Sequence, residues 1–238
     1  MEKQFFQMAK QERQFAQNFF SDVRIESESL TPIQQHSSAK KLNRATDYYL
    51  QRFIKFPQIA IFHSYPEYLH AALLEGNPLI TSFVPQPFRL LVQNRRYVPD
   101  CFYVFRTKRY VIELKPEGKF DTKLKKPLKG YFKQQGFNFK VLTNESILKK
   151  ETLALNWHHI VKTLLSAEMI NTDTEELKIM DQLSVEGETE FGLLIKIGDR
   201  LANQKLEIAV FRLAHRGQIA LDLKDRKINY STMVALCS

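Results

Sequence analysis

The 238-residue sequence is poor in cysteine and contains no long run of apolar residues. Its two cysteines, Cys101 and Cys237, lie far apart, which excludes a disulfide framework and a zinc-binding pattern. No apolar stretch reaches the roughly 18–20 residues that span a bilayer. The charged N-terminus MEKQFFQMAKQERQF also lacks the apolar segment of a signal peptide. We therefore expect a protein of the reducing cytoplasm that does not enter a membrane.

Several catalytic signatures are also missing. No GxxxxGK[ST] loop is present, so the chain is not expected to hydrolyse ATP itself. No Ser/His/Asp arrangement for nucleophilic catalysis is evident. Metal-ligand spacing is not found among the following histidines: His63, His70, His158, His159 and His215. Proline is absent after Pro127, which indicates a loop-rich α/β first part and a mostly helical second part.

Acidic residues are scarce in one segment of the chain. Residues 86–150 carry 16 Lys and Arg against five Asp and Glu, whereas the rest carries 19 against 21. A concentrated positive region is typical of proteins that bind a phosphate backbone. A solvated surface that aids solubility is the alternative, but such a local excess favours nucleic acid.

The basic segment contains YVPDCFYVFRTKRYVIELKPEGK, residues 97–119, which has the pattern of two apolar strands around a short basic turn. Because successive side chains of a strand point to opposite faces, Glu113 and Lys115 share a face. If the strands close over a turn of residues 106–109, Asp100 lies directly opposite Lys115. A turn one residue longer or shorter would move Asp100 to the other face.

The three charges in these strands have two interpretations. An exposed hairpin can carry an ordinary Glu/Lys pair. Both faces are apolar around the charges, however, and a buried carboxylate is costly unless a cation or a metal is paired with it. Since one lysine cannot neutralise both Asp100 and Glu113, a divalent metal is the better explanation.

The apolar spacing predicts the order helix, strand, strand, strand, helix, strand, which is typical of an α/β sandwich. The first of these helices begins with the S-x-x-E spacing of a capping box at Ser64 and Glu67, and it ends at Gly76. The expected segments are an amphipathic helix at 3–20 (Phe5, Met8, Phe15, Phe19), a loop at 22–40, a helix at 63–76, strands at 83–93, 97–105 and 109–115, a lysine-rich loop and helix at 115–136, and a strand at 137–145.

After about residue 150 the pattern becomes mostly helical. The last predicted helix stops at Gly217, and the segments IALDL and INYSTMVAL then predict a hairpin around KDRK. Helices followed by a two-stranded ribbon are typical of a winged-helix shape. The expected segments are helices at 153–165, 173–186, 191–202 and 205–217, and strands at 219–223 and 228–236.

The short motifs PD (99–100) and E-x-K (113–115) resemble the signature of the PD-(D/E)-x-K nuclease superfamily. The surrounding words SYPEYLHAALLEGNPLITSFVPQPF, RRYVPDCFYVF, YVIELKP, FKVLTNESI and LALNW resemble the TnsA family of transposon endonucleases. The resemblance covers roughly residues 60–165. It implies a restriction-endonuclease-like mixed sheet flanked by helices in residues 1–165 (core about 57–150, N-terminal helical extension 1–56). It also implies a mostly helical, winged-helix-like C-terminal domain in residues 166–238.

The resemblance assigns roles to the residues of the hairpin. Asp100 and Glu113 would hold Mg²⁺, for which carboxylates are suitable hard ligands, together with the backbone carbonyl of Leu114. Two ions are expected, and Mn²⁺ is expected to substitute. Lys115 would orient or activate the attacking water and stabilise the transition state.

Two further residues match the resemblance. Glu67 would be the additional acid from the preceding helix and would complete a second metal position. Its other interpretation is a plain capping-box residue, and Glu75 is a competing acid eight residues later. Gln86 matches the QP word that opens the first core strand, and a supporting hydrogen bond is expected of it rather than catalysis.

The family implies a Mg²⁺-dependent DNA endonuclease of a heteromeric transposase in a bacterial cytoplasm, associated with the nucleoid when assembled. The chain would cut the non-transferred strand at the 5′ ends of a mobile element. A DDE-type transposase would cut and join the 3′ ends, and an AAA+ ATPase would license both. Two alternatives stay open: a restriction-like or junction-resolving nuclease that acts alone, or a non-catalytic DNA-binding assembly subunit of the same fold.

Two basic groups have different expected partners. The first follows the E-x-K strand and is expected to grip double-stranded DNA: Lys119, Lys123, Lys125, Lys126, Lys129 and Lys133. The second lies on the candidate recognition helix of the C-terminal domain: Lys205, Arg212 and Arg216. Residues 166–238 nevertheless hold nine Lys and Arg against 12 Asp and Glu. Since that sign repels phosphates, we expect this domain to bind a transposase or AAA+ subunit, or else only to support the nuclease domain.

Overall fold

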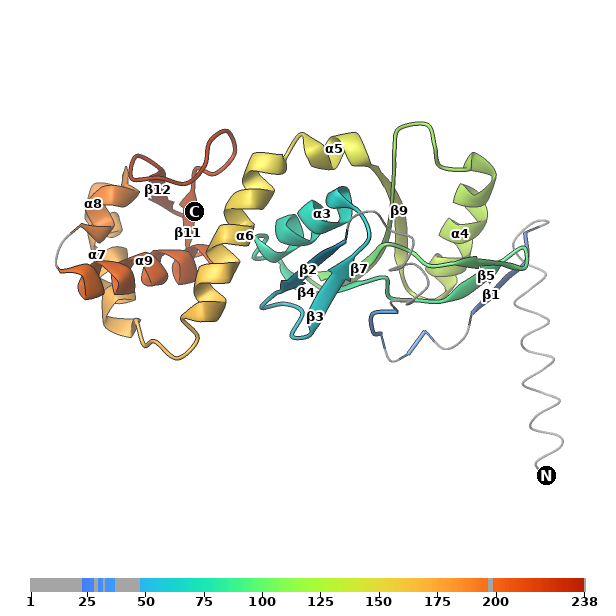
Figure 1. Ribbon diagram of the computed structural model, residues 1–238, viewed down its shortest axis with the longest axis horizontal. Coiled ribbons are helices and arrows are strands. Elements are labelled where there is room, and N and C mark those ends of the chain that lie inside the picture. The colour runs from blue at the N-terminus through green and yellow to red at the C-terminus, as the bar shows by residue number, and fades with distance from the viewer. Residues whose placement is uncertain (1–22, 28–29, 32, 37–47, 197–198, 238) are drawn as a thin grey trace, which may run out of the picture. The chain divides into compact units, whose positions relative to one another are not determined.

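The computed structural model describes residues 23–27, 30–31, 33–36, 48–196 and 199–237 (Figure 1). The helix expected at residues 3–20 lies outside these ranges. The chain divides into two compact units: the first comprises Met1–Ala45 and Val84–Asn144, and the second comprises Thr46–Phe83 and Glu145–Ser238. The predicted boundary after residue 165 divides the chain differently, and it stays a prediction.

A mixed four-stranded sheet provides the frame of the first unit (Figure 1). Its strands lie in the order β4 (Ile80–Pro85, of which Val84 and Pro85 belong to this unit), β7 (Cys101–Phe105), β8 (Lys108–Lys115) and β9 (Asn138–Thr143). β7 and β8 are antiparallel, whereas β8 and β9 are parallel. A parallel pair needs a long crossover, and helix α4 (Thr122–Gln134) provides it. The expected class, an α/β protein with a mixed sheet and flanking helices, is confirmed at this level.

The register of the β7–β8 hairpin differs from the expected one by two residues. Phe105 pairs with Lys108, so the turn contains only Arg106 and Thr107 rather than four residues. Two-residue connections are favoured because their twist matches that of the strands, and they require positive φ angles; Arg106 has φ 53°. A shift of two residues leaves every side chain on its predicted face.

A second sheet of the first unit was largely missed by the sequence patterns. It contains β1 (Ile25–Ser27), β5 (Leu90–Val92) and β6 (Arg95–Tyr97) in the order β1-β5-β6. The strand expected at 83–93 is wrong, because Gln86, at φ 47°, and the proline after it separate β4 from β5. β6 returns through a turn at Gln93 and Asn94, both at positive φ. β1 falls within the segment expected to be a loop.

Aromatic side chains fill the core of the first unit. Helix α4 begins at the capping residue Asp121, whose Oδ1 accepts a hydrogen bond from Lys123 N at 3.0 Å. The buried side of the helix brings Phe132 onto Phe139 of β9, with ring centroids 5.5 Å apart. Because a buried Phe→Ala change typically costs about 3–5 kcal/mol, Phe132 is a main support of the sheet.

Helices dominate the second unit. The helices expected at 63–76, 153–165 and 173–186 are confirmed, and α3 packs on α6 while α7 packs on α9. The bounds are α3 (Tyr65–Glu75), α5 (Asn144–Leu148, whose first residue belongs to the first unit), α6 (Glu151–Ser166), α7 (Asp173–Glu186), α8 (Phe191–Ile195) and α9 (Arg200–His215).

Two helix ends differ from expectation for physical reasons. The helix expected at 191–202 is wrong, because Asp199 starts a new helix by accepting a hydrogen bond from Ala202 N at 2.9 Å. Gly76 ends α3 as predicted, but its φ is −75° rather than left-handed. Glycine is needed there because a Cβ would lie 2.2 Å from the Trp157 ring.

Two small sheets complete the second unit. β2 (Tyr49–Arg52) and β3 (Ile59–Phe62) form an antiparallel pair. The expected C-terminal ribbon is present as β11 (Ile219–Leu221) and β12 (Met233–Leu236), but β10 (Glu188–Glu190) adds a third strand in the order β10-β12-β11. Among the described residues, no helix is both long and apolar enough to cross a membrane.

Candidate active site

Asp100 lies immediately before β7 and is fixed through both its backbone and its side chain. Its N–H donates to Ile112 O at 3.0 Å, and its carbonyl accepts from Gln86 N at 2.9 Å. Its Oδ2 accepts from Leu114 N at 2.6 Å. The short connection after β6 thus brings this carboxylate to β8 with a defined orientation.

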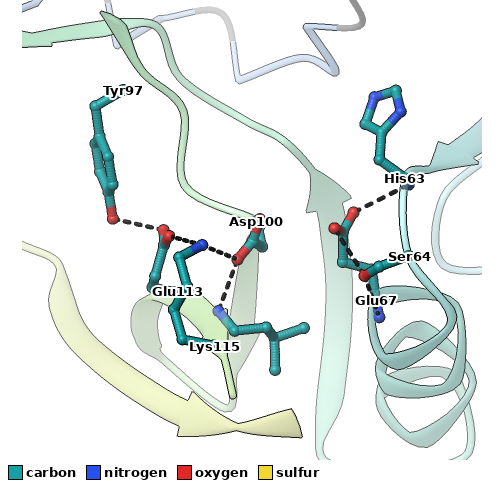
Figure 2. A network of polar contacts seen from close by, with 8 residues as sticks. His63, Ser64, Glu67, Tyr97, Asp100, Glu113 and Lys115 are labelled. Carbon is teal, nitrogen blue, oxygen red and sulfur yellow. Dashed lines mark hydrogen bonds and ion pairs between the residues drawn. The ribbon is translucent and has the colours of Figure 1, made fainter. Parts of the chain in front are cut away.

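Glu113 and Lys115 project from β8 toward Asp100 (Figure 2). The Glu113 residue is only 2% exposed, and its Oε1 lies 2.5 Å from Lys115 Nζ. The same Nζ lies 4.0 Å from Asp100 Oδ2, and the Lys115 side chain is 39% exposed. The structure therefore brings these three predicted residues together, through a two-residue turn rather than the expected four-residue one.

A hydrogen bond from Tyr97 completes the surroundings of Glu113. Tyr97, the last residue of β6, donates its O–H to Glu113 Oε2 at 2.6 Å. Burial, the charge of Glu113 and this hydrogen bond raise the pKa of Tyr97 well above its usual value. Tyr97 is therefore a fixed hydrogen-bond donor. The sequence analysis missed this residue because β6 was not predicted, although Tyr97 stands in the quoted word YVPD.

The donor set fits a hard divalent cation. Asp100 and Glu113 offer carboxylate oxygens, and a single half-exposed lysine leaves the trio with an excess negative charge. The carbonyl of Leu114 points to the same side of β8 as its N–H, toward Asp100, because both groups of a strand residue face one neighbour. Among the described residues, no three His, Cys, Asp or Glu side chains form a metal-binding group. Waters and a substrate phosphate would therefore supply the other ligands.

Gln86 supports Asp100 through its backbone. The residue is buried at φ 47°, and its N–H donates to Asp100 O. Its own carbonyl accepts from His36 N at 3.0 Å. The structure thus places Gln86 where the resemblance implies a supporting hydrogen bond, and the backbone supplies that bond.

Glu67 belongs to the second unit, where it lies in the first turn of α3 (Figure 2). Ser64 is the N-cap residue, and its hydroxyl accepts from Glu67 N at 3.4 Å and donates to Glu67 Oε1 at 2.9 Å. Glu67 Oε2 accepts from His63 N at 3.3 Å, one residue earlier than in a standard capping box. The predicted cap is confirmed, and the predicted metal role stays a prediction.

Glu75, the competing acid, is fully buried within the second unit. Its Oε2 accepts from Lys55 N at 3.0 Å, and its Oε1 lies 2.7 Å from His215 Nε2. Lys55 Nζ donates to the carbonyls of Glu75 and Asn77 at 2.6 and 2.7 Å. Since Glu75 is 0% exposed and lies against a largely buried lysine and a ring nitrogen of its own unit, it is suited to packing rather than to metal binding.

The two basic groups have different surroundings. All six lysines expected to bind DNA are exposed, and five of them lie on α4, whose other side enters the core. In the second unit, Arg212 donates to Thr172 Oγ1 at 2.7 Å and to Ala167 O at 3.0 Å. Arg216 pairs with Glu176. Two of the three candidate recognition-helix cations are therefore used within their own unit.

No family model and no curated protein matches this sequence. The resemblance to the TnsA family consequently stays an interpretation of the quoted words. The residues and their geometry are the basis for a functional assignment.

Proposed function

We propose that this chain is a Mg²⁺-dependent DNA endonuclease that cuts the non-transferred strand at the 5′ ends of a mobile element. The observation that supports the proposal is the meeting of Asp100, Glu113 and Lys115 on one face of the β7–β8 hairpin. The hairpin lies inside the most basic segment of the chain. A scaffold protein has no need for two adjacent carboxylates at this place.

Each residue of the trio has a chemical role in this proposal. Bound Mg²⁺ would supply Lewis-acid activation of a phosphodiester, with Mn²⁺ as a substitute and Glu67 as a ligand for a second ion. Asp100 and Glu113 bind the cation through their oxygens, and Asp100 is oriented by the Leu114 amide. Lys115 holds the attacking water, and it stabilises the negative charge that develops on the phosphate.

The finer fold assignment belongs to the same proposal. In the first unit, the mixed sheet supports a restriction-endonuclease-like core, since one acid lies immediately before β7 and the other on the adjacent β8. In the second unit, α7, α8 and α9 with the sheet β10-β12-β11 support a winged-helix-like domain. The negative balance of residues 166–238 and the engagement of Arg212 and Arg216 support a protein partner for this domain rather than DNA.

The proposed partners follow from the proposed reaction, in which this chain cuts only the 5′ ends and another subunit must process the 3′ ends. This chain would act in a bacterial cytoplasm, near the nucleoid, with a DDE-type transposase subunit for the 3′ ends and an AAA+ ATPase as regulator. A stand-alone restriction-like or junction-resolving nuclease is the second candidate, since the same trio would serve it. A non-catalytic assembly subunit is less consistent with the trio.

One experiment separates these candidates. The purified chain is incubated with Mg²⁺ and duplex DNA that carries an element end, with and without the DDE-type subunit encoded beside it. Cuts at 5′ ends only in the presence of the partner are expected, and Asp100→Ala serves as the matched control. Efficient cutting by the chain alone would favour the stand-alone nuclease. The absence of 5′ cuts under every condition, while 3′ joining proceeds, would reject the nuclease.

A further inference from the structure

The far end of the β7–β8 hairpin gathers positive charge without any acid. Arg106, Lys108 and Arg109 stand at the turn, and Lys140 of β9 pairs with Ile112 of β8. We call these four exposed cations the tip patch. Residues 101–112 and 122–144 contain no Asp or Glu. Among the described residues, no ion pair involves any of the four cations, so no described acid neutralises their charge.

Three of these cations are held on aromatic rings. Arg106 lies over Phe105 at 5.7 Å, Arg109 over Phe137 at 5.4 Å, and Lys140 over Tyr110 at 4.7 Å from the ring centroids. Such contacts hold a long side chain without cancelling its charge. Ordering the cations in advance lowers the entropic cost of binding an anion.

The rings themselves belong to the fixed part of the sheet. Tyr110 stacks on Tyr103 across the hairpin, with centroids 5.0 Å apart. Asn138, opposite Tyr110 in the parallel pair, donates to Arg109 O at 3.1 Å. The tip patch is therefore anchored to three strands, which distinguishes it from a run of freely solvated lysines.

We infer that the tip patch binds the phosphate backbone of duplex DNA at a second position, separate from the α4 lysines and from the Asp100–Glu113 pair. The inference rests on the proposed function only in taking DNA as the substrate. Lys108 and Lys115 are seven residues apart along β8, which is about 23 Å at 3.3 Å per residue. About seven base pairs span that length at 3.4 Å each. Arg109 shares the face of Glu113 and Lys115, whereas Lys108 and Lys140 alternate to the opposite face of the sheet. A duplex held at the acids can therefore reach Arg109 along one face, and the other cations would contact phosphates around the end of the hairpin.

The test compares the salt dependence of DNA binding for the unaltered full chain and two variants of it. A 30-bp duplex of random sequence is titrated by fluorescence anisotropy without divalent metal. The tip variant carries Arg106→Gln, Lys108→Gln, Arg109→Gln and Lys140→Gln. Each lost phosphate contact lowers the slope of log K against log salt by about 0.9, so a loss of up to about 3.6 is expected. The matched control removes four exposed cations of the second unit: Lys178→Gln, Lys224→Gln, Arg226→Gln and Lys227→Gln.

The outcomes distinguish this inference from the proposed function. A slope lowered in the tip variant but not in the control supports the inference. An unchanged slope, or a decrease equal to that of the control, overturns it. An unchanged slope combined with lost binding to polyglutamate would assign the patch to an acidic protein instead. The proposed nuclease is judged separately, by Mg²⁺-dependent cleavage and by the slope of the α4 variant Lys123→Gln, Lys125→Gln and Lys126→Gln.

A second variant guards against misfolding. Loss of two arginine–ring contacts can weaken the hairpin, which thermal unfolding of the tip variant would reveal. Lys108→Gln with Lys140→Gln leaves both arginines on their rings. This pair is expected to lower the slope by about 1.8, and no decrease at all would reject the patch.

Discussion

Two glutamates of the described residues are buried, one in each unit, and their surroundings differ. Glu75 is 0% exposed, and the Lys55 amide and the His215 ring occupy its two oxygens. Glu113 is 2% exposed, and Tyr97 and Lys115 occupy its oxygens. Only Glu113 has a second carboxylate beside its cation, since Lys115 is shared with Asp100.

The comparison of the two glutamates distinguishes a site that stabilises the fold from a site that can bind a cation. The partners of Glu75 are enclosed with it, and burial of its neighbour Lys55 lowers the pKa of that amine to about 8. The cation of Glu113 is half-exposed, and the local charge is negative. A site of this kind gains by binding an external cation, whereas the Glu75 site gains nothing. Loss of Glu75 should therefore affect stability, and loss of the Asp100–Glu113 site should affect chemistry.

The largest effect is expected from breaking the active-site trio. Asp100→Ala or Lys115→Ala should reduce Mg²⁺-dependent strand cleavage by at least about 10²–10³-fold, because each removes a group that acts on the reacting phosphate. DNA affinity should stay nearly constant. Single-turnover cleavage and anisotropy measure the two quantities.

The fold of these variants is the control. Removal of Asp100 relieves repulsion with Glu113 but leaves the Leu114 amide without its acceptor, so the unfolding midpoint should change little. Full cleavage by either variant would show that the active site lies elsewhere.

The next effect concerns stability in the second unit. Glu75→Ala leaves the Lys55 amide and the His215 ring without their acceptor, and breaking a buried pair typically costs about 3–5 kcal/mol. Urea unfolding measures the loss. Glu113→Gln should cost much less, and the exposed Glu168→Ala provides a baseline. Equal losses for Glu75→Ala and Glu113→Gln would abolish the distinction between the two sites.

Tyr97→Phe tests the hydrogen bond that orients Glu113, and its expected effect is smaller than that of the preceding variants. The ring stays in place while the 2.6 Å hydrogen bond is lost, and loss of such a supporting contact typically lowers metal affinity by about 10–100-fold. Calorimetric titration with Mn²⁺ measures the affinity without any cleavage. Tyr131→Phe, in the core of the same unit, is the matched control. Unchanged Mn²⁺ binding by Tyr97→Phe would leave this tyrosine a purely structural role.

The smallest effect should come from Glu67→Gln. Gln also serves at this capping position, so the stability loss should stay below the ~0.5–2 kcal/mol typical of a lost cap. Cleavage should nevertheless fall, and its dependence on Mg²⁺ concentration should change. If the variant cuts at the normal rate, Glu67 is only a helix cap.

Local patterns in the sequence predicted much of the site. Alternation along the hairpin placed Asp100, Glu113 and Lys115 on one face, and the S-x-x-E spacing predicted the cap of α3. These features depend on residues that are close in sequence, or on the two-residue period of a strand. These predictions consequently stayed correct although the predicted register of the β7–β8 hairpin was wrong by two residues.

Contacts between distant segments could not be predicted in this way. The pairing of Glu75 with His215 joins residues 140 positions apart, and no local pattern marks it. Tyr97 was missed because β6 is only three residues long and exists by pairing with β5. In both cases tertiary packing, not propensity, decides the structure.

The two-residue period of the hairpin has a consequence for its tolerance to changes in length. Removal or insertion of residues in pairs at the Arg106–Thr107 turn slides one strand past the other while both keep their orientation. The acids and the lysine would still share a face, although Asp100 would be displaced along β8 relative to Glu113 and Lys115. A single-residue insertion would instead invert one strand. Turn variants of different length therefore test this period. Changes by an even number of residues should keep the acids and the lysine on one face, and changes by an odd number should separate them and abolish the site.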